Sequence, residues 1–584
     1  MTEPADLRRL ERALRTALDE LLDAMHPDGY WEGELSSSAL ATATAVSALA
    51  AGGRDRYAPL RRRGGEWLRA HQNADGGWGD SPESPSNLST TLLGVAALTL
   101  CGDERDPAAL ARAEEYVTAR AGRSAEDRIA AVTASYGKDR TFAVPILTNC
   151  AIAGLVPWDH IPALPFELAV FPHSWYRLLR LHVVSYALPA LVAVGLVLHR
   201  RRPTRNPAAR AARRLAEPRA LRKLEAIQPE SGGFLEAVPL TSFVAMSLAE
   251  AGLADHPVTR RGLEFLVRSA RPDGSWPIDS NLSVWLTSNA LLALDAARGL
   301  DRIDADKTRR WLAEQQHRTA HPYTNTPPGA WAWTHLPGGV PDADDTARSL
   351  LALEQTGGHE GAAAAVRWLL GVQNRDGGWP TFCRGWGRLA FDRSSPDLTA
   401  HALLALGAVR EHYRTRRLNR AIRRGRDSLR RSQRPDGTWL PLWFGNQQAP
   451  DQQSPVLGTA SVLPALFQLG ERENPRRGIG YLIDTQDPGG GWGGAKGVAP
   501  SVEETALAVS ALIDAPGSPE AHAAARRGIA YLLRRIEDDT WRRASPIGLY
   551  FSRLWYSERL YPIIWVVEAL GKAVAKARTE PPRG

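Results

Sequence analysis

The stretch Gln373–Trp379, QNRDGGW, recurs along this chain with its spacing unchanged. The same Gln-x5-Trp phrase ends at Trp78, Trp439 and Trp492, and altered copies end at Trp31, Phe234 and Trp276. Each copy follows a helical run and carries Asp-Gly or Gly-Gly turn residues, after which another helical run begins. The Gln amide can bond main-chain groups at the start of the next helix. The phrase therefore predicts helix pairs that bury their apolar faces by packing on neighbouring pairs.

Length and composition narrow the class of protein. With 584 residues and 43% hydrophobic content, the chain can form two or three domain-sized cores. The three cysteines show neither metal-ligand spacing nor a disulfide framework, which indicates a reducing compartment. The first helical stretch is charged and lacks the apolar core of a signal peptide. The net charge is +8, but the arginines are scattered and no nucleic-acid-binding motif is present, so we expect no nucleic-acid partner.

A second pattern, DADD at positions 342–345, places three carboxyl groups within four residues. It follows Trp331 and Trp333 and precedes an apolar helical run. Capping of that helix accounts for one Asp, or two. A third forces like charges together, so at least one carboxyl should stay protonated at neutral pH. The motif therefore indicates a Brønsted acid beside aromatic rings.

One segment, residues 183–198, is apolar throughout but shorter than the roughly 20 residues of a membrane span. It contains Pro189 and is followed by three arginines at positions 200–202. One interpretation is a plateau that dips into one leaflet while the arginines meet anionic headgroups. The other is a buried core helix followed by a solvated basic loop. The sequence alone leaves both open.

Together, the repeats and the DADDTA motif resemble the bacterial squalene-hopene cyclases, which are class II terpene cyclases, over nearly the whole chain. The resemblance implies an all-α fold of two α/α-barrel domains with a large apolar cavity between them. Residues 1–20 and 297–584 would form the barrel with the acid motif, and residues 21–296 the inserted barrel. A segment around residues 165–200 would face the membrane, attaching the protein as a monotopic protein to the cytoplasmic side of the cell membrane. No cofactor or metal is implied, and a homodimer is one assembly that the resemblance allows.

The family resemblance assigns the catalytic residues by their positions in the matching motifs. Asp344 matches the family's proton donor, Asp342 and Asp345 its flanking carboxylates, and His401 the histidine paired with the acid. Asp397 lies four residues before His401, on the same helical face, where it can hold the imidazole charged and oriented.

Aromatic faces suit the carbocation that follows, because they attract a cation and offer no basic atom to alkylate. The side chains expected around the substrate are Trp285, Trp331, Trp333, Trp443, Tyr186, Phe382, Tyr550 and Phe551. Tyr186 stands where the family usually has Trp, and Trp333 where Phe is usual. These departures bear on the product.

The predicted function is a protonation-initiated polyene cyclase that converts a long linear isoprenoid such as squalene to a hopanoid-like polycyclic terpene. A class II cyclase of a prenyl diphosphate is one alternative, and it would favour a cationic site for the head group. A non-catalytic isoprenoid-binding protein is another, although the intact acid motif and His401 argue against it.

Overall fold

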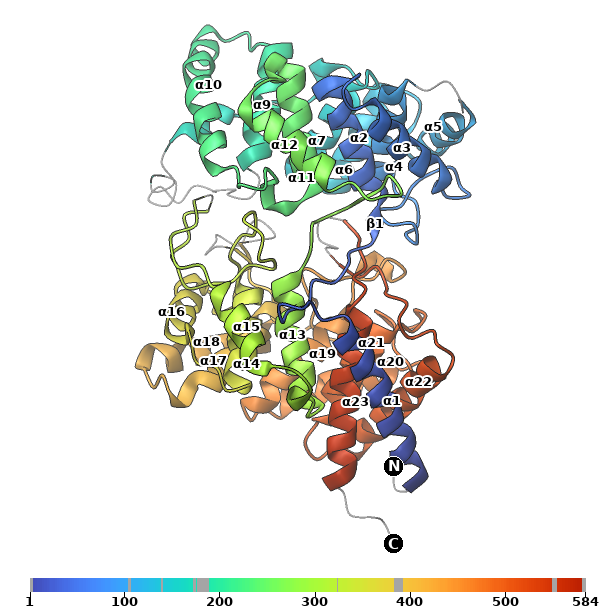
Figure 1. Ribbon diagram of the computed structural model, residues 1–584, viewed down its shortest axis with the longest axis vertical. Helices are drawn as coiled ribbons and strands as arrows, with labels where there is room; N and C mark the ends of the chain where they lie inside the picture. Colours follow the sequence, from blue (N-terminus) through green and yellow to red (C-terminus); the bar gives the residue numbers. More distant parts are fainter. Residues whose placement is uncertain are drawn as a thin grey trace.

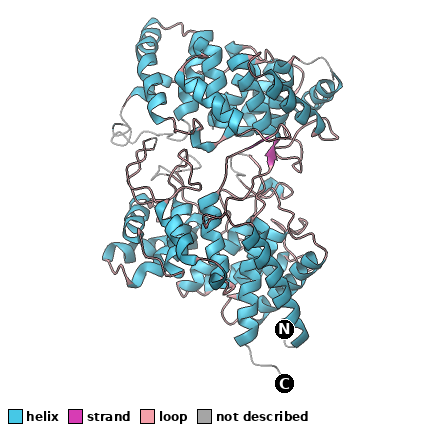
Figure 2. Ribbon diagram, in the orientation of Figure 1, coloured by secondary structure: helices cyan, strands magenta, loops and turns pink. Residues whose placement is uncertain are grey.

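The computed structural model describes residues 4–102, 107–137, 140–171, 175, 188–322, 324–382, 392–548 and 554–579. Its regular secondary structure is almost all helical, and the helices gather into two bodies, one above the other in Figures 1 and 2. The two short strands of the described chain, β1 (Ser37–Ser38) and β2 (Trp276–Pro277), pair antiparallel where the chain passes between the bodies. The prediction of an all-α fold with two helical barrels is confirmed.

The body that contains both termini is built on a closed ring of inner helices. In ring order these are α13 (Ser283–Ala296), α15 (Ala343–Gln355), α17 (Pro396–Ala408), α19 (Pro455–Gln468), α21 (Val502–Ile513) and α23 (Tyr561–Thr579). Each packs on the next, and α23 closes on α13. Packed against this ring are α1 (Pro4–Asp23), α14 (Ala305–Glu314), α16 (Ala362–Val372), α18 (Arg416–Ser432), α20 (Glu473–Thr485) and α22 (Pro519–Glu537). We call this body the acid barrel.

The inserted body has a second ring. Its inner helices are α2 (Ala39–Gly53), α4 (Leu88–Cys101), α7 (Arg140–Ile152), α9 (Leu188–Arg201) and α11 (Val238–Leu248). Around them lie α3 (Ala58–Ala70), α5 (Pro107–Ala121), α6 (Ala125–Tyr136), α10 (Pro207–Ile227) and α12 (Pro257–Arg268). Short helical turns complete the described chain: η1 (Trp158–His160), η2 (Phe166–Val170), η3 (Phe234–Glu236), η4 (Ala249–Leu253), η5 (Leu300–Arg302), η6 (Val409–Glu411) and η7 (Pro450–Gln452).

The expected domain boundary at residues 296 and 297 needs correction. Helix α13 lies before that boundary, yet it packs on α15 and α23 and closes the acid barrel. Its side chains Trp285, Leu286 and Ala290 belong to the apolar core of that barrel. The boundary between the two barrels therefore lies before α13 in the sequence. At the other end, α1 extends to Asp23 before the chain crosses to the inserted barrel.

The repeated glutamine fastens neighbouring helix pairs, but its second bond reaches the outer helix after the next one along the chain, whereas the start of the next helix was expected. Gln373 Nε2 donates to the carbonyl of Gly377 in its own turn, at 2.8 Å, and to that of Ala421 in α18, at 2.9 Å. Gln72, Gln433 and Gln486 make the same two bonds in their own repeats. Gly377 adopts a φ of +94°, and a Cβ there would lie 2.3 Å from the Arg424 carbonyl. Glycine is therefore required at this close approach.

The repeated tryptophan joins the helices on either side of the turn. The Trp379 indole N–H donates to the Leu369 carbonyl in α16, at 2.9 Å, and its main-chain N–H donates to Thr399 Oγ1 in α17, at 3.0 Å. The ring is completely buried. Both polar ends of the tryptophan are therefore satisfied while its large apolar surface leaves water.

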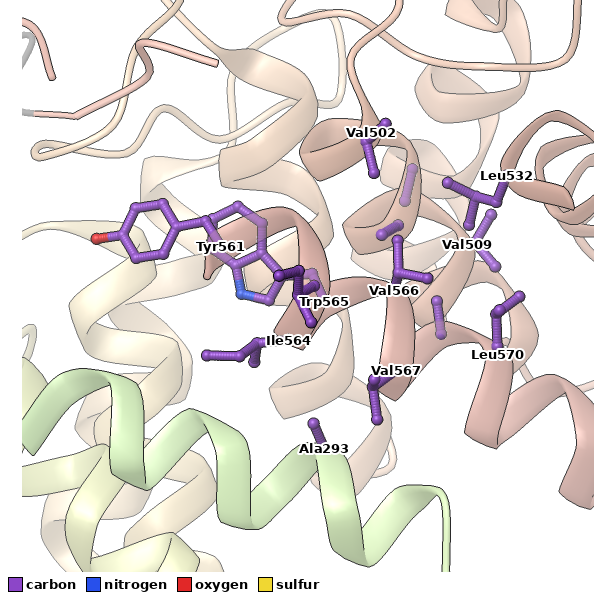
Figure 3. Packing of buried hydrophobic residues seen from close by; sticks show 14 of the residues in the cluster. Ala293, Val502, Val509, Leu532, Tyr561, Ile564, Trp565, Val566, Val567 and Leu570 are labelled. Carbon is purple, nitrogen blue, oxygen red and sulfur yellow. The ribbon is translucent and has the colours of Figure 1, made fainter. Parts of the chain in front are cut away.

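Apolar side chains from successive helices form the barrel core. In Figure 3, Val509 of α21, Leu532 of α22 and Val566 of α23 lie together. All three are fully buried. The Ala- and Leu-rich patterns of the sequence correspond to these inward faces, where burial of each large aliphatic side chain contributes roughly 1.5–3 kcal/mol.

The plateau predicted at residues 183–198 is a core helix where the structure describes it. Helix α9 is buried from Leu188 to His199 except at the half-buried Leu191, so the core-helix interpretation is right for these residues. Arg200 and Arg201 pair with Glu217 and Glu250, and Arg202 donates to the Asp159 carbonyl. These arginines are therefore engaged within the protein. No helix among the described residues is both long and apolar enough to cross a membrane.

Candidate active site

A cavity of about 280 Å³ lies between the two barrels, as the sequence predicted. The inserted barrel contributes Leu93 of α4, Phe142 of α7 and Phe243 of α11 to its wall. The acid barrel contributes the start of α15 and the beginning of α13. All three aspartates of the DADD motif line this cavity.

The acid motif forms the first turn of α15. Asp342 is the N-cap, and its Oδ1 accepts the main-chain N–H of Asp344, at 2.8 Å, and of Asp345, at 2.9 Å. Its own N–H donates to the Trp331 carbonyl, at 3.0 Å. Capping thus accounts for Asp342, and the turn it fixes presents Asp344 to the cavity.

Burial keeps a proton on the two outer carboxyls. Desolvation raises the pKa of Asp342 to about 7, even though hydrogen bonds from Asp345 lower it. Desolvation and the neighbouring Asp342 raise the pKa of Asp345 well above its ordinary value. Like charges this close cannot all ionise, so Asp345 holds a proton that it shares with Asp342 at neutral pH.

Asp344 has a different partner. His401 Nδ1, from the second turn of α17, lies 2.5 Å from Asp344 Oδ1. Both side chains are mostly buried, because Asp344 is 13% exposed and His401 is 15% exposed. A charged hydrogen bond in so dry a site is stronger than one in water. The predicted pair of Asp344 and His401 is therefore brought together.

Asp397 lies in the first turn of α17, below His401. Its carboxylate accepts a hydrogen bond from Ser395 Oγ, and no hydrogen bond between it and His401 is present in the described structure. Desolvation raises the pKa of Asp397 to about 6, and the charge of His401 opposes that shift. Asp397 was expected to keep the imidazole charged and oriented. The described contacts show the interaction of charges but no hydrogen bond that would orient the ring.

Two charged residues that the sequence analysis missed lie inside the acid barrel near this pair. Arg348 lies one turn after Asp344 on α15, and its Nε donates to Asn289 Oδ1 of α13, at 3.0 Å. Its guanidinium also attracts the charge of Asp344. Glu568 of α23 pairs with Lys572, at 3.1 Å. Although desolvation opposes it, attraction by Lys572, Arg348 and His401 lowers the pKa of Glu568, which keeps it ionised. The i,i+4 spacing from Asp344 could have revealed Arg348, but Glu568 comes from a distant part of the chain.

Three of the expected rings form a continuous wall of the cavity. Trp333 and Phe382 meet edge to face with ring centroids 6.4 Å apart, and Phe382 and Trp443 do so at 5.9 Å. The Trp285 ring centroid lies 6.4 Å from that of His401. All four line the cavity. A cation formed beside Asp344 would therefore lie in a cavity with aromatic side chains, whose ring faces attract it.

Comparison with known proteins decides the family. The profile of the squalene-hopene cyclase N-terminal domain matches residues 14–238, and that of the C-terminal domain matches residues 281–575. The chain belongs to the squalene-hopene cyclase family. It is 27% identical to the squalene-hopene cyclase of Alicyclobacillus acidocaldarius, over 97% of this chain and 98% of that one. It is 26% identical to the probable squalene-hopene cyclase of Sinorhizobium fredii, over 94% of both chains.

Among solved structures, ent-copalyl diphosphate synthase from Streptomyces platensis has a similar fold, with a TM-score of 0.59 over 97% of this chain and 99% of that one. The sequence identity is 22%, so this likeness concerns the fold. Family membership and the geometry around Asp344 agree. The protein is a class II polyene cyclase, which closes rings of an apolar isoprenoid.

One expected substrate-binding residue of the cyclase lies elsewhere. Trp331 is completely buried and does not line the cavity. Its indole N–H donates to the Leu312 carbonyl, at 2.7 Å, and its main-chain N–H to Thr346 Oγ1, at 3.0 Å. These are the bonds of a repeat tryptophan. The repeat was hidden because its glutamine, Gln316, stands fifteen residues before the tryptophan, yet it makes the same two amide bonds.

The expected residues Tyr186, Tyr550 and Phe551 lie outside the described residues. The cavity also contains rings that the sequence analysis did not select: Tyr136, Phe142, Phe243, Phe444, Tyr556 and Tyr561. Of these, Tyr556 and Tyr561 have their hydroxyl oxygens 3.2 Å apart. Their sequence positions carry no motif, because each reaches the cavity only through the packing of separate helices and loops.

Metal-ligand side chains gather at one place in the described structure. His359 Nδ1 lies 2.9 Å from Glu354 Oε2, and His412 Nε2 lies 3.1 Å from Glu354 Oε1. Glu354 belongs to the last turn of α15, at the opposite end of that helix from Asp344. A metal ion bound there would not reach the cavity.

Proposed function

We propose that the cyclase protonates a terminal alkene of a long linear isoprenoid hydrocarbon, with Asp344 as the acid and squalene as the first candidate substrate. The proton moves from the Asp344 carboxyl to an alkene carbon, and the π electrons form the new C–H bond. A tertiary carbocation and the Asp344 carboxylate remain. His401, as an imidazolium, stabilises that carboxylate. The Asp344–His401 contact of 2.5 Å is the observation that carries this proposal.

The charge of the cavity wall favours a hydrocarbon over a prenyl diphosphate. Among the described residues that line the cavity, the ionisable side chains are four aspartates and three tyrosines, and no Lys, Arg or His is included. A diphosphate head would need cations for its negative charge and would be repelled by carboxylates.

The test is incubation of the purified enzyme with squalene and, separately, with geranylgeranyl diphosphate, followed by mass analysis of the products. We expect polycyclic triterpenes from squalene and slow or no cyclisation of the diphosphate. Preferential cyclisation of the diphosphate would instead support the alternative substrate class. Drimenyl diphosphate synthase of Streptomyces showdoensis, 27% identical over 75% of this chain and 74% of that one, shows why this comparison is needed.

The same proposal includes attachment to a membrane, the source of such a substrate. Leu168, Phe171 and Trp175 are 45%, 41% and 55% exposed, and the two rings stack at 5.7 Å. Helix α10, which packs on η2, carries the exposed Arg214, Arg219 and Arg222. Exposed apolar rings beside a basic helix suit insertion into an anionic leaflet. The cytoplasmic face of the cell membrane supplies such lipids.

Binding to vesicles tests the attachment. Wild-type enzyme should sediment with phosphatidylglycerol vesicles, and replacement of Leu168, Phe171 and Trp175 by Ser should release it without lowering its melting temperature. Val267→Ser, which alters an exposed apolar residue of α12, serves as the control. Equal sedimentation of the triple variant would contradict this surface. Sedimentation equilibrium in detergent would test the homodimer, for which the prediction rests on the family resemblance.

A further inference from the structure

A second carboxyl group faces the cavity outside the acid motif. Asp279 follows β2 on the strand that crosses from the inserted barrel to the acid barrel, opposite Ala237. Its Oδ1 accepts the main-chain N–H of Ser280, at 2.7 Å. Of the described carboxyl groups that line the cavity, it alone lies outside residues 342–345. The protonation mechanism gives this residue no role.

The surroundings of Asp279 decide its charge. Glu236 lies close behind it and is almost completely buried, and its Oε1 accepts Ser231 Oγ at 2.6 Å and the Gly338 N–H at 2.7 Å. Desolvation and the charge of Glu236 raise the pKa of Asp279 well above its ordinary value, against the effects of the Ser280 N–H and the Trp333 indole. Desolvation also raises the pKa of Glu236, but that carboxyl accepts several hydrogen bonds that favour its charge, so Asp279 is the one of the two that keeps its proton. Asp279 therefore presents an O–H donor to the cavity.

A hydrocarbon cannot accept that hydrogen bond. Leaving a buried donor without a partner costs roughly 1–3 kcal/mol. Wall positions around it are apolar, with Ala237, Ile278 and Leu282 among them. A buried donor in an apolar wall is unfavourable unless it has a partner. Its presence here indicates that a hydrogen-bond acceptor is supplied when the substrate occupies the cavity.

We propose that Asp279 forms a subsite for a neutral oxygen atom, supplied either by a hydroxyl group on the isoprenoid or by an ordered water molecule that stays beside it. The proposal rests on the proposed cyclase function and extends it to substrate choice. A neutral oxygen fits because Asp279 donates one hydrogen bond, whereas an anionic head group would lie against Glu236 and the acid motif. No bond of the substrate is made or broken at Asp279.

The experiment compares two substrates that differ in one group: geranylgeraniol and the same tetraprenyl chain without its hydroxyl. For a substrate hydroxyl, wild-type kcat/KM should favour the alcohol by about tenfold, as expected for one hydrogen bond of about 1.4 kcal/mol. Asp279→Leu should abolish the preference. Asp279→Asn should keep much of it, because the amide N–H can still donate. Ser280→Ala is the matched control, since its hydroxyl is directed at Glu236, and should retain the full preference.

If an ordered water molecule supplies the oxygen atom, the experiment should give a different result. For an ordered water, the two substrates should react alike, and crystals of the wild type should show a water molecule within hydrogen-bonding distance of the Asp279 carboxyl that is missing in Asp279→Leu. The proposal is overturned if neither the preference nor the water is found, or if Asp279→Leu keeps the preference at an unchanged melting temperature. Failure of the wild type to cyclise either chain or squalene would instead overturn the proposed function.

Discussion

Asp344 lies among charges that match the state left after it loses its proton. His401 contacts it directly, and Arg348 attracts it from one helical turn away. On the other side, Glu568 attracts His401. The buried cation therefore faces the new carboxylate and the buried anion faces the imidazolium. Such fixed charges lower the barrier because they need no reorganisation during the reaction.

Replacing the acid should remove the reaction and leave the protein folded. Asp344→Asn keeps the shape of the side chain but has no acidic proton, so turnover should fall by about 10³-fold or more. Product yield and melting temperature are measured together. Asp427→Asn, on the outer helix α18, is the control and should be fully active. Near-normal turnover by the Asp344 variant would show that another group supplies the proton.

Glu568→Gln should change the pH dependence without weakening substrate binding. Without the carboxylate, the buried negative charge that attracts His401 is gone, so the pH profile of kcat should change while KM stays the same. Asp514→Asn removes only the outer partner of Lys572 and should leave the profile in place. A uniform loss of activity at every pH would mean that Glu568 is merely structural.

Stability should also depend on Asp342. Its pKa is about 7 in the folded protein against an ordinary value of 3.8, so the folded chain holds this proton more tightly than the unfolded chain. The resulting stabilisation is complete below about pH 4 and is lost as the pH rises to about 7. Asp342→Asn keeps the N-cap and should reduce the fall in melting temperature between these pH values. An unchanged slope would contradict the protonated state of Asp342.

Single elements explain both the success and the errors of the sequence analysis. The Gln-to-Trp spacing specifies local bonds within one turn, and the capping Asp342 is likewise local, so both could be predicted. The burial of α9 could not, because an apolar run is equally suited to lipid and to the helices that surround it. Asp279 reaches the cavity, and Glu568 comes near His401, because elements far apart in the sequence pack together. The periodicity of the sequence does not reveal such contacts.

One turn can be tested for its part in fastening the helices. Gln373→Ala removes two buried amide bonds and leaves the Gly377 carbonyl without its partner, which should cost about 2–3 kcal/mol. The urea midpoint of unfolding should fall accordingly. Gln448→Ala, at an exposed position, should not change it. Equal midpoints for the two variants would show that the repeat glutamine contributes little to stability.

At the scale of the whole molecule, α1 completes the acid barrel by packing on α23 and α22. Leu10, Ala17 and Leu21 are fully buried in that contact. A chain that begins at residue 24 should therefore expose the apolar face of α23, bind a hydrophobic dye and fail to cyclise. A synthetic α1 peptide should restore part of the activity, and the same peptide with Leu10→Asp and Leu21→Asp should not. Full activity without α1 would mean that the ring of inner helices is sufficient.

The contact between α1 and α23 also sets an order of events during synthesis on the ribosome. The inserted barrel, from α2 to α12, has left the exit tunnel long before α23 is made, so its own ring can close first. Helix α1 is made before the inserted barrel and must wait, with its apolar face uncovered, until α23 has been made. During that interval a chaperone or a lipid surface is the natural cover for α1. The nascent chain cannot carry out premature acid chemistry, because the barrel that holds Asp344 against His401 closes only after α23 has been made.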